Sequence, residues 1–421
     1  MRRSNVLRRF AHHVALISLG LLILPVVGQA DIVTDWTAVT TSAVVAGAPR
    51  AGAVEFAIVH AAMYAAVNAI DKSYEVYKVD PVAPTRGAST DAAAAAAAYQ
   101  TLKGLFPAQA TTLDAAYATS IATIPSGMAK ARGIAIGEEV AARMLELRAN
   151  DGRTGVVPYV FGTGAGVYQQ TPAPYPPTGP VNTFLPQVTP MVLLSPWQFR
   201  AYGPPGLSSA RYTKDLQEVR AYGSLTSTVR TEEQSEIARF HTENPNQFWG
   251  RNLGNLAASR KLGTVRSARL MALLAFAQAD AAIACFDSKY VYNFWRPVTA
   301  IQQADIDGNP ATQADPSWVA YVGTPPHPEY PAAHGCVAGA IAATLASYFG
   351  THQVRFQMNS LVTGTTHYYK TTDELVREVE NARVYGGMHF RNSVEHGVRL
   401  GKAVAKWIEH KALERRAHSH P

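Results

Sequence analysis

Apolar residues recur at helical spacing along most of the chain, and this pattern predicts an all-α protein. Residues 53–70, AVEFAIVHAAMYAAVNAI, predict a buried helix, and alanines 92–98 predict the start of another, because alanine has the highest helix propensity. Residues 267–290 are apolar on nearly every side, which is typical of a helix at the centre of a fold. We therefore expect helices packed around a central helix in 267–290.

Residues 153–210 interrupt this pattern. Many prolines and glycines argue against helix over most of the span, and scattered aromatic residues indicate that it packs on something. We interpret it as an irregular cover between an N-terminal helical region, residues 31–152, and a helical catalytic region, residues 211–421. The full set of further expected helices is 109–123, 127–150, 211–222, 230–243, 246–260, 334–349, 372–387 and 390–412, and the central helix is expected over 265–288.

The first thirty residues are typical of a signal peptide. Four arginines precede an apolar run, Val14–Val27, and the small residues of Gly28-Gln29-Ala30 follow it. A run this short falls below the roughly 20 residues that span a bilayer. We predict cleavage after Ala30 and export to the periplasm or the medium, with an uncleaved anchor as the alternative. No further membrane-length apolar run is expected.

Removal of residues 1–30 also changes the charge. Four of the seven units of formal positive charge lie there, which leaves +3 on the mature chain. The basic isoelectric point is therefore poor support for nucleic-acid binding, and no nucleic-acid partner is expected. Export would permit a disulfide between Cys285 and Cys336, whereas two buried core thiols are the alternative that we favour.

Three short islands carry the candidate chemistry: KYVYNFWRP at 289–297, HPEYPAAH at 327–334 and ARVYGGMHF at 382–390. We single out three cations and two of the imidazoles in them, and only one acid, Glu329, lies inside them. Such a set suits a tetrahedral oxyanion, because the cations neutralise it, one imidazole can bond its central atom and the other can move a proton. The basic side chains are Lys289, Arg296, Arg383, His334 and His389.

The spacing within each island predicts how it is presented. Lys289 and Arg296 would lie two turns apart on one helix face if the helix continues, and Pro297 would end or kink it. His334 would stand at the positive end of the following apolar helix, where free N–H groups favour an anion. Glycines 386–387 would break the preceding helix and let the chain close on the site.

Some polar residues of the apolar helices have simpler interpretations. His60 is interpreted as a core histidine rather than a ligand. Asp280 and Asp287 are the only acids of residues 267–290, and each is expected to face solvent or to cap a helix. For Asp280, a buried ion pair with one of the island arginines is the alternative.

Each island alone is a weak signal, but their order and spacing resemble one superfamily. It joins vanadium-dependent haloperoxidases with type 2 phosphatidic acid phosphatases and bacterial acid phosphatases. Its pattern is Lys, six residues, Arg-Pro; then Pro-Ser-Gly-His; then Ser-Arg, five residues, His, three residues, Asp. Sequence segments such as NFWRPVTAI and HPEYPAAH are similar to those of the soluble haloperoxidase-like branch. The resemblance runs from about Trp197 to Lys406.

The resemblance implies a helical-bundle core, and it implies roles at the matching positions. Lys289, Arg296 and Arg383 would hold the oxygens of vanadate or phosphate, together with the backbone N–H near Ala333. His389 would bond to vanadium, or attack phosphorus as a nucleophile. The acid–base residue would be His334. A homo-oligomer is left open.

The chain departs from the family pattern at three positions. Ala332 stands in place of Ser and removes a hydroxyl donor, Ala333 replaces Gly, and Ser393 replaces the Asp that orients the essential histidine. A nucleophilic histidine depends strongly on an orienting carboxylate, whereas a histidine that is a metal ligand can use a neutral acceptor. We interpret the missing Asp as favouring the haloperoxidase branch.

Three functions follow from these observations. The first is a haloperoxidase that uses vanadate, hydrogen peroxide and halide. The alternative is an exported phosphatase that hydrolyses a phosphomonoester through a phosphohistidine. The third, suggested by the losses at Ala332 and Ser393, is a non-catalytic oxyanion-binding protein.

Overall fold

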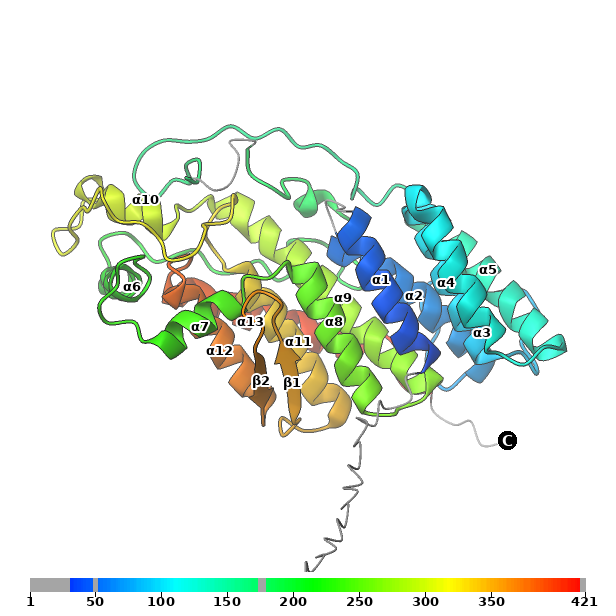
Figure 1. Cartoon of the computed structure of the whole chain (residues 1–421). Coiled ribbons are helices and arrows are strands. Elements are labelled where there is room, and N and C mark those ends of the chain that lie inside the picture. Colours follow the sequence, from blue (N-terminus) through cyan, green and yellow to red (C-terminus); the bar gives the residue numbers. More distant parts are fainter. Residues whose placement is uncertain (1–30, 48–51, 173–178, 417–421) are drawn as a thin grey trace, which may run out of the picture.

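The computed structural model describes residues 31–47, 52–172 and 179–416, so the expected signal peptide lies outside the described residues. The described residues form thirteen α-helices and one two-stranded antiparallel sheet, which confirms the all-α prediction (Figure 1). The helices are α1 (Ile32–Gly47), α2 (Gly52–Asp71), α3 (Thr90–Leu105), α4 (Ala110–Ala122), α5 (Met128–Leu147), α6 (Ala210–Tyr222), α7 (Glu232–Phe240), α8 (Pro245–Ser259), α9 (Thr264–Tyr292), α10 (Pro297–Gln302), α11 (Ala333–Phe349), α12 (Thr372–Tyr385) and α13 (Arg391–Lys411). The strands β1 (Phe356–Asn359) and β2 (Thr366–Tyr369) form a small hairpin that the sequence patterning did not predict.

Helix α9 is the centre of the fold, as its all-round apolar sequence predicts. Its residues from Leu270 to Ala281 are all buried, because α2 packs on one side of it and α11 and α13 pack on another. By length and composition alone α2 and α9 could cross a membrane, which was not expected from the apolar runs. Their most apolar windows are 89% and 94% buried inside the fold, so this is weak support for a membrane span.

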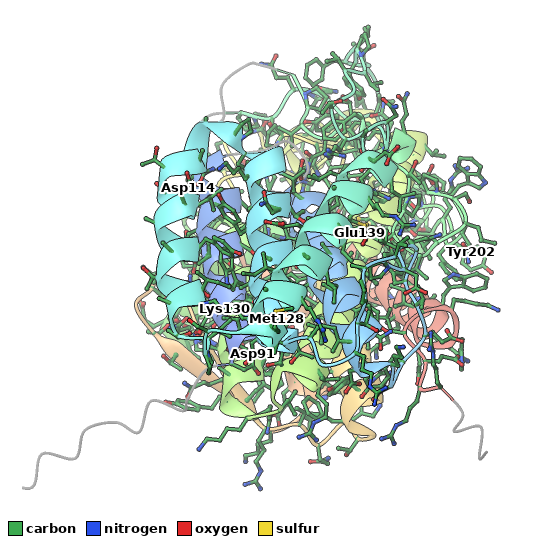
Figure 2. All side chains as sticks on the ribbon, turned by 90° about the vertical axis from the view of Figure 1, so that its right-hand side faces the viewer. Asp91, Asp114, Met128, Lys130, Glu139 and Tyr202 are labelled. Atoms are coloured by element: carbon green, nitrogen blue, oxygen red, sulfur yellow. The ribbon has the colours of Figure 1, made fainter. Side chains whose placement is uncertain are left out.

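The N-terminal helices α1 to α5 form a layer beside α9, and Figure 2 shows α3, α4 and α5 side by side. Alanines on α3 and glycines on α5 let these two helices approach closely. A Cβ at Gly137 would lie 2.5 Å from the carbonyl oxygen of Ala93, closer than real contacts allow. The alanine-rich stretch therefore serves close packing as well as helix propensity. Ser89 caps α3 by accepting the Ala92 N–H.

The cover segment, residues 153–210, crosses the top of the molecule in Figure 1. In its described part the regular structure before α6 is one short 3₁₀ helix, η2 (Leu185–Gln187). Two acids of α9 hold it. Asp280 accepts the backbone N–H groups of residues 191–193 at 2.6–2.9 Å, and Asp287 binds the Arg200 guanidinium through both oxygens at 2.7 and 2.9 Å.

These contacts correct the expectations for both acids. Asp280 and Asp287 are buried, so neither faces solvent, and neither is paired with an island arginine. The carboxylates instead satisfy groups of the cover segment. Sequence patterning could not predict this, because the partners lie almost ninety residues earlier in the chain.

The chain between Lys289 and Arg296 also differs from the expected geometry. Helix α9 ends at Tyr292, and Asn293 follows in the left-handed conformation with φ 47°. Arg296 is extended and caps α10, in which Pro297 is the first residue. One continuous helix face therefore does not carry both cations. Proline is favoured at the first helical position, so Pro297 starts a new helix instead of ending the old one.

Two further expectations concern the core. His60 is 1% exposed and packs against the Phe56 ring, with the ring centroids 4.4 Å apart, and burial lowers its pKa to about 3. It is a neutral core histidine, as predicted. Cys285 and Cys336 are both buried and free, which agrees with the interpretation as core thiols.

Candidate oxyanion-binding site

The fold brings five side chains of the three islands together from different helices and loops. Lys289 comes from the last turn of α9, and Arg296 from the start of α10. His334 lies in the first turn of α11, and Arg383 in the last turn of α12. His389 follows the Gly386–Gly387 break, where Gly387 has φ 77°, and it precedes α13 by two residues. The glycine break predicted from the sequence is therefore present and turns His389 back toward the cations.

Hydrogen bonds determine the tautomer of His389. Nη1 of Arg296 lies 3.0 Å from Nε2 of His389, and a guanidinium can only donate, so Nε2 is the acceptor. The ring proton of the neutral imidazole is then on Nδ1, which donates to Oε1 of Glu329 at 2.8 Å. The same oxygen accepts the Phe390 N–H at 3.0 Å. His389 thus directs the Nε2 lone pair toward the cationic side of the site.

The interpretation drawn from Ser393, that His389 lacks an orienting carboxylate, is wrong. Glu329 orients His389, but it comes from the second island instead of following the histidine in sequence. Ser393 reaches the Glu329 carbonyl only at 3.5 Å. The missing Asp therefore does not favour a haloperoxidase over a phosphatase. The available signal was that Glu329 is the only acid in the three islands.

Lys289 and Arg296 lie behind the histidines and are fully buried. The Lys289 ammonium donates to the carbonyls of Pro328 and Glu329 at 2.7 and 2.9 Å. Arg296 donates through Nε to the His327 carbonyl at 2.8 Å, and its Nη2 lies 2.9 Å from Nδ1 of the same residue. His327 is a residue of this site that the sequence reasoning missed, although it opens the HPEYPAAH island.

A cavity of about 700 Å³ opens in front of these groups. His334, Arg383 and His389 line its polar end together with His241 and His327. The remaining wall comes from α2, the cover segment, α8, α9, the loop of residues 322–326 and α11. Lys289 and Arg296 do not line the cavity, but Arg296 contacts the lining residues His389 and His327.

Arg383 and His334 both line the cavity together with His389. Arg383 donates through Nη1 to the His241 carbonyl at 3.0 Å, and its Nη2 lies 2.7 Å from the Met388 sulfur. Burial and the Arg383 charge hold the pKa of His334 well below its usual value. Burial and the charges of Arg296 and Lys289 do the same for the pKa of His389. Both imidazoles are therefore neutral bases.

His241 is held in place by a second polar network that reaches the hairpin. Its Nε2 lies 2.9 Å from Oε1 of Glu378, which also accepts from His367 and from the Tyr369 hydroxyl. The other ring nitrogen of His367 lies 2.9 Å from Glu236. The hairpin, which was not predicted, therefore supports the wall residue His241 through Glu378.

The charges of the site fit an oxyanion. Three buried cations face one buried carboxylate, Glu329, and burial raises the pKa of that carboxyl to about 7 although Lys289 and Arg296 oppose the rise. Burial also lowers the pKa of Lys289 to about 8, and the Arg296 charge adds to this. An anion of the size of vanadate or phosphate would offset this excess of positive charge. The first turn of α11 adds backbone N–H groups at Ala333 and His334.

Comparison with known proteins supports the same assignment. Residues 269–417 match the family model described as the VCPO second helical-bundle domain. Over 180 residues the chain is 26% identical to the vanadium chloroperoxidase of Curvularia inaequalis, an alignment that covers 35% of this chain and 29% of that protein. The chain thus aligns with less than a third of the length of this curated relative.

Solved structures share the whole fold. A bacterial vanadium-dependent iodoperoxidase superposes with a TM-score of 0.79 at 23% identity, covering 92% of this chain and 98% of the other. The holo form of a bacterial vanadium-dependent chloroperoxidase gives a TM-score of 0.69 at 18% identity, with 92% and 93% covered. The chain therefore shares its fold with bacterial vanadium-dependent haloperoxidases, and its residues 269–417 are similar to the second helical-bundle domain of the matched family.

Proposed function

We propose that the protein is a vanadate-dependent haloperoxidase that oxidises halide with hydrogen peroxide. The observation that carries the proposal is the neutral His389, whose Nε2 lone pair points to a buried group of cations. The haloperoxidases among the similar proteins support the same choice. When bound, vanadate supplies the Lewis-acidic centre at which peroxide becomes an oxidant for halide.

The side chains divide the remaining work. His389 would present Nε2 to vanadium, while Glu329 holds the ring in that orientation. Lys289, Arg296 and Arg383 would neutralise the oxygens, and Arg296 would exchange its contact with His389 for one with the oxyanion. His334 lines the cavity as a neutral base and would take a proton from hydrogen peroxide at a ring nitrogen.

The test is bromination or iodination of a dye after vanadate is added to the protein, over pH values from about 4 to 8, the range in which a general base of this kind operates. We expect turnover that requires both peroxide and halide. His334→Ala should slow it about 100- to 10,000-fold, the usual contribution of a general acid or base. Absence of turnover with bromide and with iodide across this pH range would reject the haloperoxidase proposal.

Glu329 supports a second candidate, an exported phosphomonoesterase. A nucleophilic histidine needs an orienting carboxylate, and His389 has one. Nε2 would attack the phosphorus of a phosphomonoester monoanion, and the bond to the leaving oxygen would break. His334, neutral in the free protein, would take the proton of the bound ester and pass it to that leaving oxygen. Hydrolysis of p-nitrophenyl phosphate that disappears in His389→Ala, with a phosphohistidine trapped by quenching, would favour this activity.

The third candidate, a non-catalytic oxyanion-binding protein, makes a different prediction. Calorimetry would then detect vanadate binding that depends on Arg296 and Arg383, while neither halogenation nor phosphate-ester hydrolysis is measurable. Turnover in either activity test eliminates it.

A further inference from the structure

Helix α9 places one amide, that of Gln278, in the wall of the cavity, about three turns before Lys289 on the same helix. Gln278 is 4% exposed and lines the cavity, and its Oε1 has no hydrogen-bond partner among the described residues. A buried acceptor without a partner costs about 1–3 kcal/mol. Because Oε1 of Gln278 lies beside an open cavity, a ligand with a hydrogen-bond donor could supply the missing partner.

Apolar side chains from four elements line the same cavity as Gln278. They are Val54 of α2, Trp249 of α8, Ala282 of α9 and Leu185 of the cover segment. The one acid among the lining residues, Glu243, is already paired with both terminal nitrogens of Arg251, at 2.5 and 2.9 Å. A ligand in this part of the cavity should accordingly be uncharged and mainly apolar.

One row of side chains connects this apolar part to the oxyanion site. Gln278, Ala282 and Phe286 lie four residues apart on one face of α9, and all three line the cavity. The row spans about 12 Å along the helix axis. At its end, the Phe286 ring packs on the His327 ring, with the centroids 5.1 Å apart. An elongated or flat molecule held at Gln278 would thus extend toward the reacting groups.

The cavity also has room for such a molecule. Its volume of about 700 Å³ lies within the range of roughly 300–1,000 Å³ that is usual for small-molecule sites. A water-sized molecule takes up only about 30 Å³. Peroxide and a halide ion would leave most of the space unfilled.

We infer that this cavity binds an uncharged aromatic substrate with a hydroxyl or N–H donor, such as a phenol, and that Gln278 anchors the donor while Val54, Trp249, Ala282 and Phe286 hold the ring. The inference rests on the proposed function for its chemistry. Hypohalous acid would transfer its halogen as a cation equivalent to a ring carbon. The displaced ring proton would combine with the remaining hydroxide to form water, so that substrate and hypohalous acid become halogenated substrate and water.

The decisive experiment measures binding without vanadate, peroxide or halide. The probes are 2-naphthol and 2-methylnaphthalene, which have nearly the same shape but differ in the donor. Their affinities for the full chain are measured by calorimetry or fluorescence, in the wild type and in Gln278→Leu. We expect Gln278→Leu to weaken 2-naphthol about three- to tenfold and to leave 2-methylnaphthalene unchanged or tighter, because only the hydroxyl loses a partner.

Two further variants complete the design. Ala282→Phe fills the space between Gln278 and Phe286 and should weaken both probes more than tenfold. Thr101→Val is the matched control, because the Thr101 hydroxyl is also buried without a partner but belongs to α3 and does not line the cavity. It should change neither affinity. If Ala282→Phe does not fold, the comparison of the two probes in Gln278→Leu still decides the question.

The outcomes separate this inference from the proposed function. Equal losses for the two probes in Gln278→Leu, or no measurable binding of 2-naphthol to the wild type, would overturn the aromatic subsite even if dye bromination succeeds. Probe binding with the expected dependence on Gln278, but without any halogenation, would retain the subsite and reject the haloperoxidase.

Discussion

Glu329 accepts the Nδ1–H of His389 at 2.8 Å, so a carboxylate from the loop before α11 orients an imidazole from the loop before α13. The bond leaves Nε2 as the nucleophilic or ligating atom. Because both side chains are buried, rotation of either one would leave the Nδ1–H of His389 without its acceptor. The pair therefore holds the histidine in one orientation, whichever oxyanion the site binds.

Removal of this carboxylate should weaken vanadate binding. We expect Glu329→Ala to lower vanadate affinity about 10- to 100-fold, the usual effect of losing a group that orients a metal ligand. Glu329→Gln should keep most of the affinity, because the amide oxygen can still accept from His389 and Phe390. Titration calorimetry with vanadate measures both. Ser393→Ala serves as the control and should stay within about twofold of the wild type, since its hydroxyl reaches only the Glu329 carbonyl, at 3.5 Å.

A serine at position 332 should strengthen oxyanion binding. Ala332 is fully buried and is the residue before the first turn of α11, with no side-chain cap. A hydrogen bond to a charged group contributes about 1.5–3 kcal/mol, so Ala332→Ser should tighten vanadate about 10- to 150-fold. Ala338→Ser on the same helix is the matched control and should not change the affinity. An unchanged affinity in Ala332→Ser, with a more stable protein, would mean that the hydroxyl only caps the helix.

The cover segment should detach when Asp280 is changed. Asp280→Ala leaves three backbone N–H groups without their acceptor, and we expect a loss of about 3–5 kcal/mol in the free energy of unfolding. Asp280→Asn should cost less, because its oxygen can still accept. Urea unfolding and limited proteolysis within residues 153–210 measure the change. Asp287→Asn, whose partner Arg200 is partly exposed, should have the smaller effect.

Low pH should destabilise the protein by protonating Glu378, the carboxylate that binds His241. Burial alone would raise the pKa of this carboxyl, but hydrogen bonds from His241 and His367 lower it to about 2. A lowered carboxyl pKa contributes stability that is present above the unfolded value of 4.5 and is lost as the pH falls toward 2. The contribution is about 3 kcal/mol at neutral pH.

Urea unfolding at several pH values tests this contribution. Glu378→Gln should be less stable than the wild type at pH 7, and the difference should shrink as the pH falls from 4.5 toward 2. The exposed Asp305→Asn is the control and should match the wild type throughout. A constant difference at all pH values would show that Glu378 acts through packing and not through its charge.

Apolar patterning and helix propensity along the sequence predicted most of the helices, and the sequence motifs pointed to the cationic side chains of the site. The long apolar stretches predicted α2 and the central α9, and the helix propensity of alanine predicted α3. The pattern missed the β1–β2 hairpin, because each strand has only four residues and the apolar alternation in β1 is too short to indicate a strand. It also placed Lys289 and Arg296 on one helix, because the left-handed turn at Asn293 is not visible in the spacing.

The sequence by itself determined that three islands carry three cations, three histidines and one acid, and that their spacing resembles one superfamily. Only the tertiary structure decided which groups touch. Glu329 orients His389 across sixty residues of sequence, Asp280 holds the cover segment, and Gln278 faces an apolar cavity. The physical reason is that a buried polar atom must find a partner in space, and residues far apart in the chain can provide it.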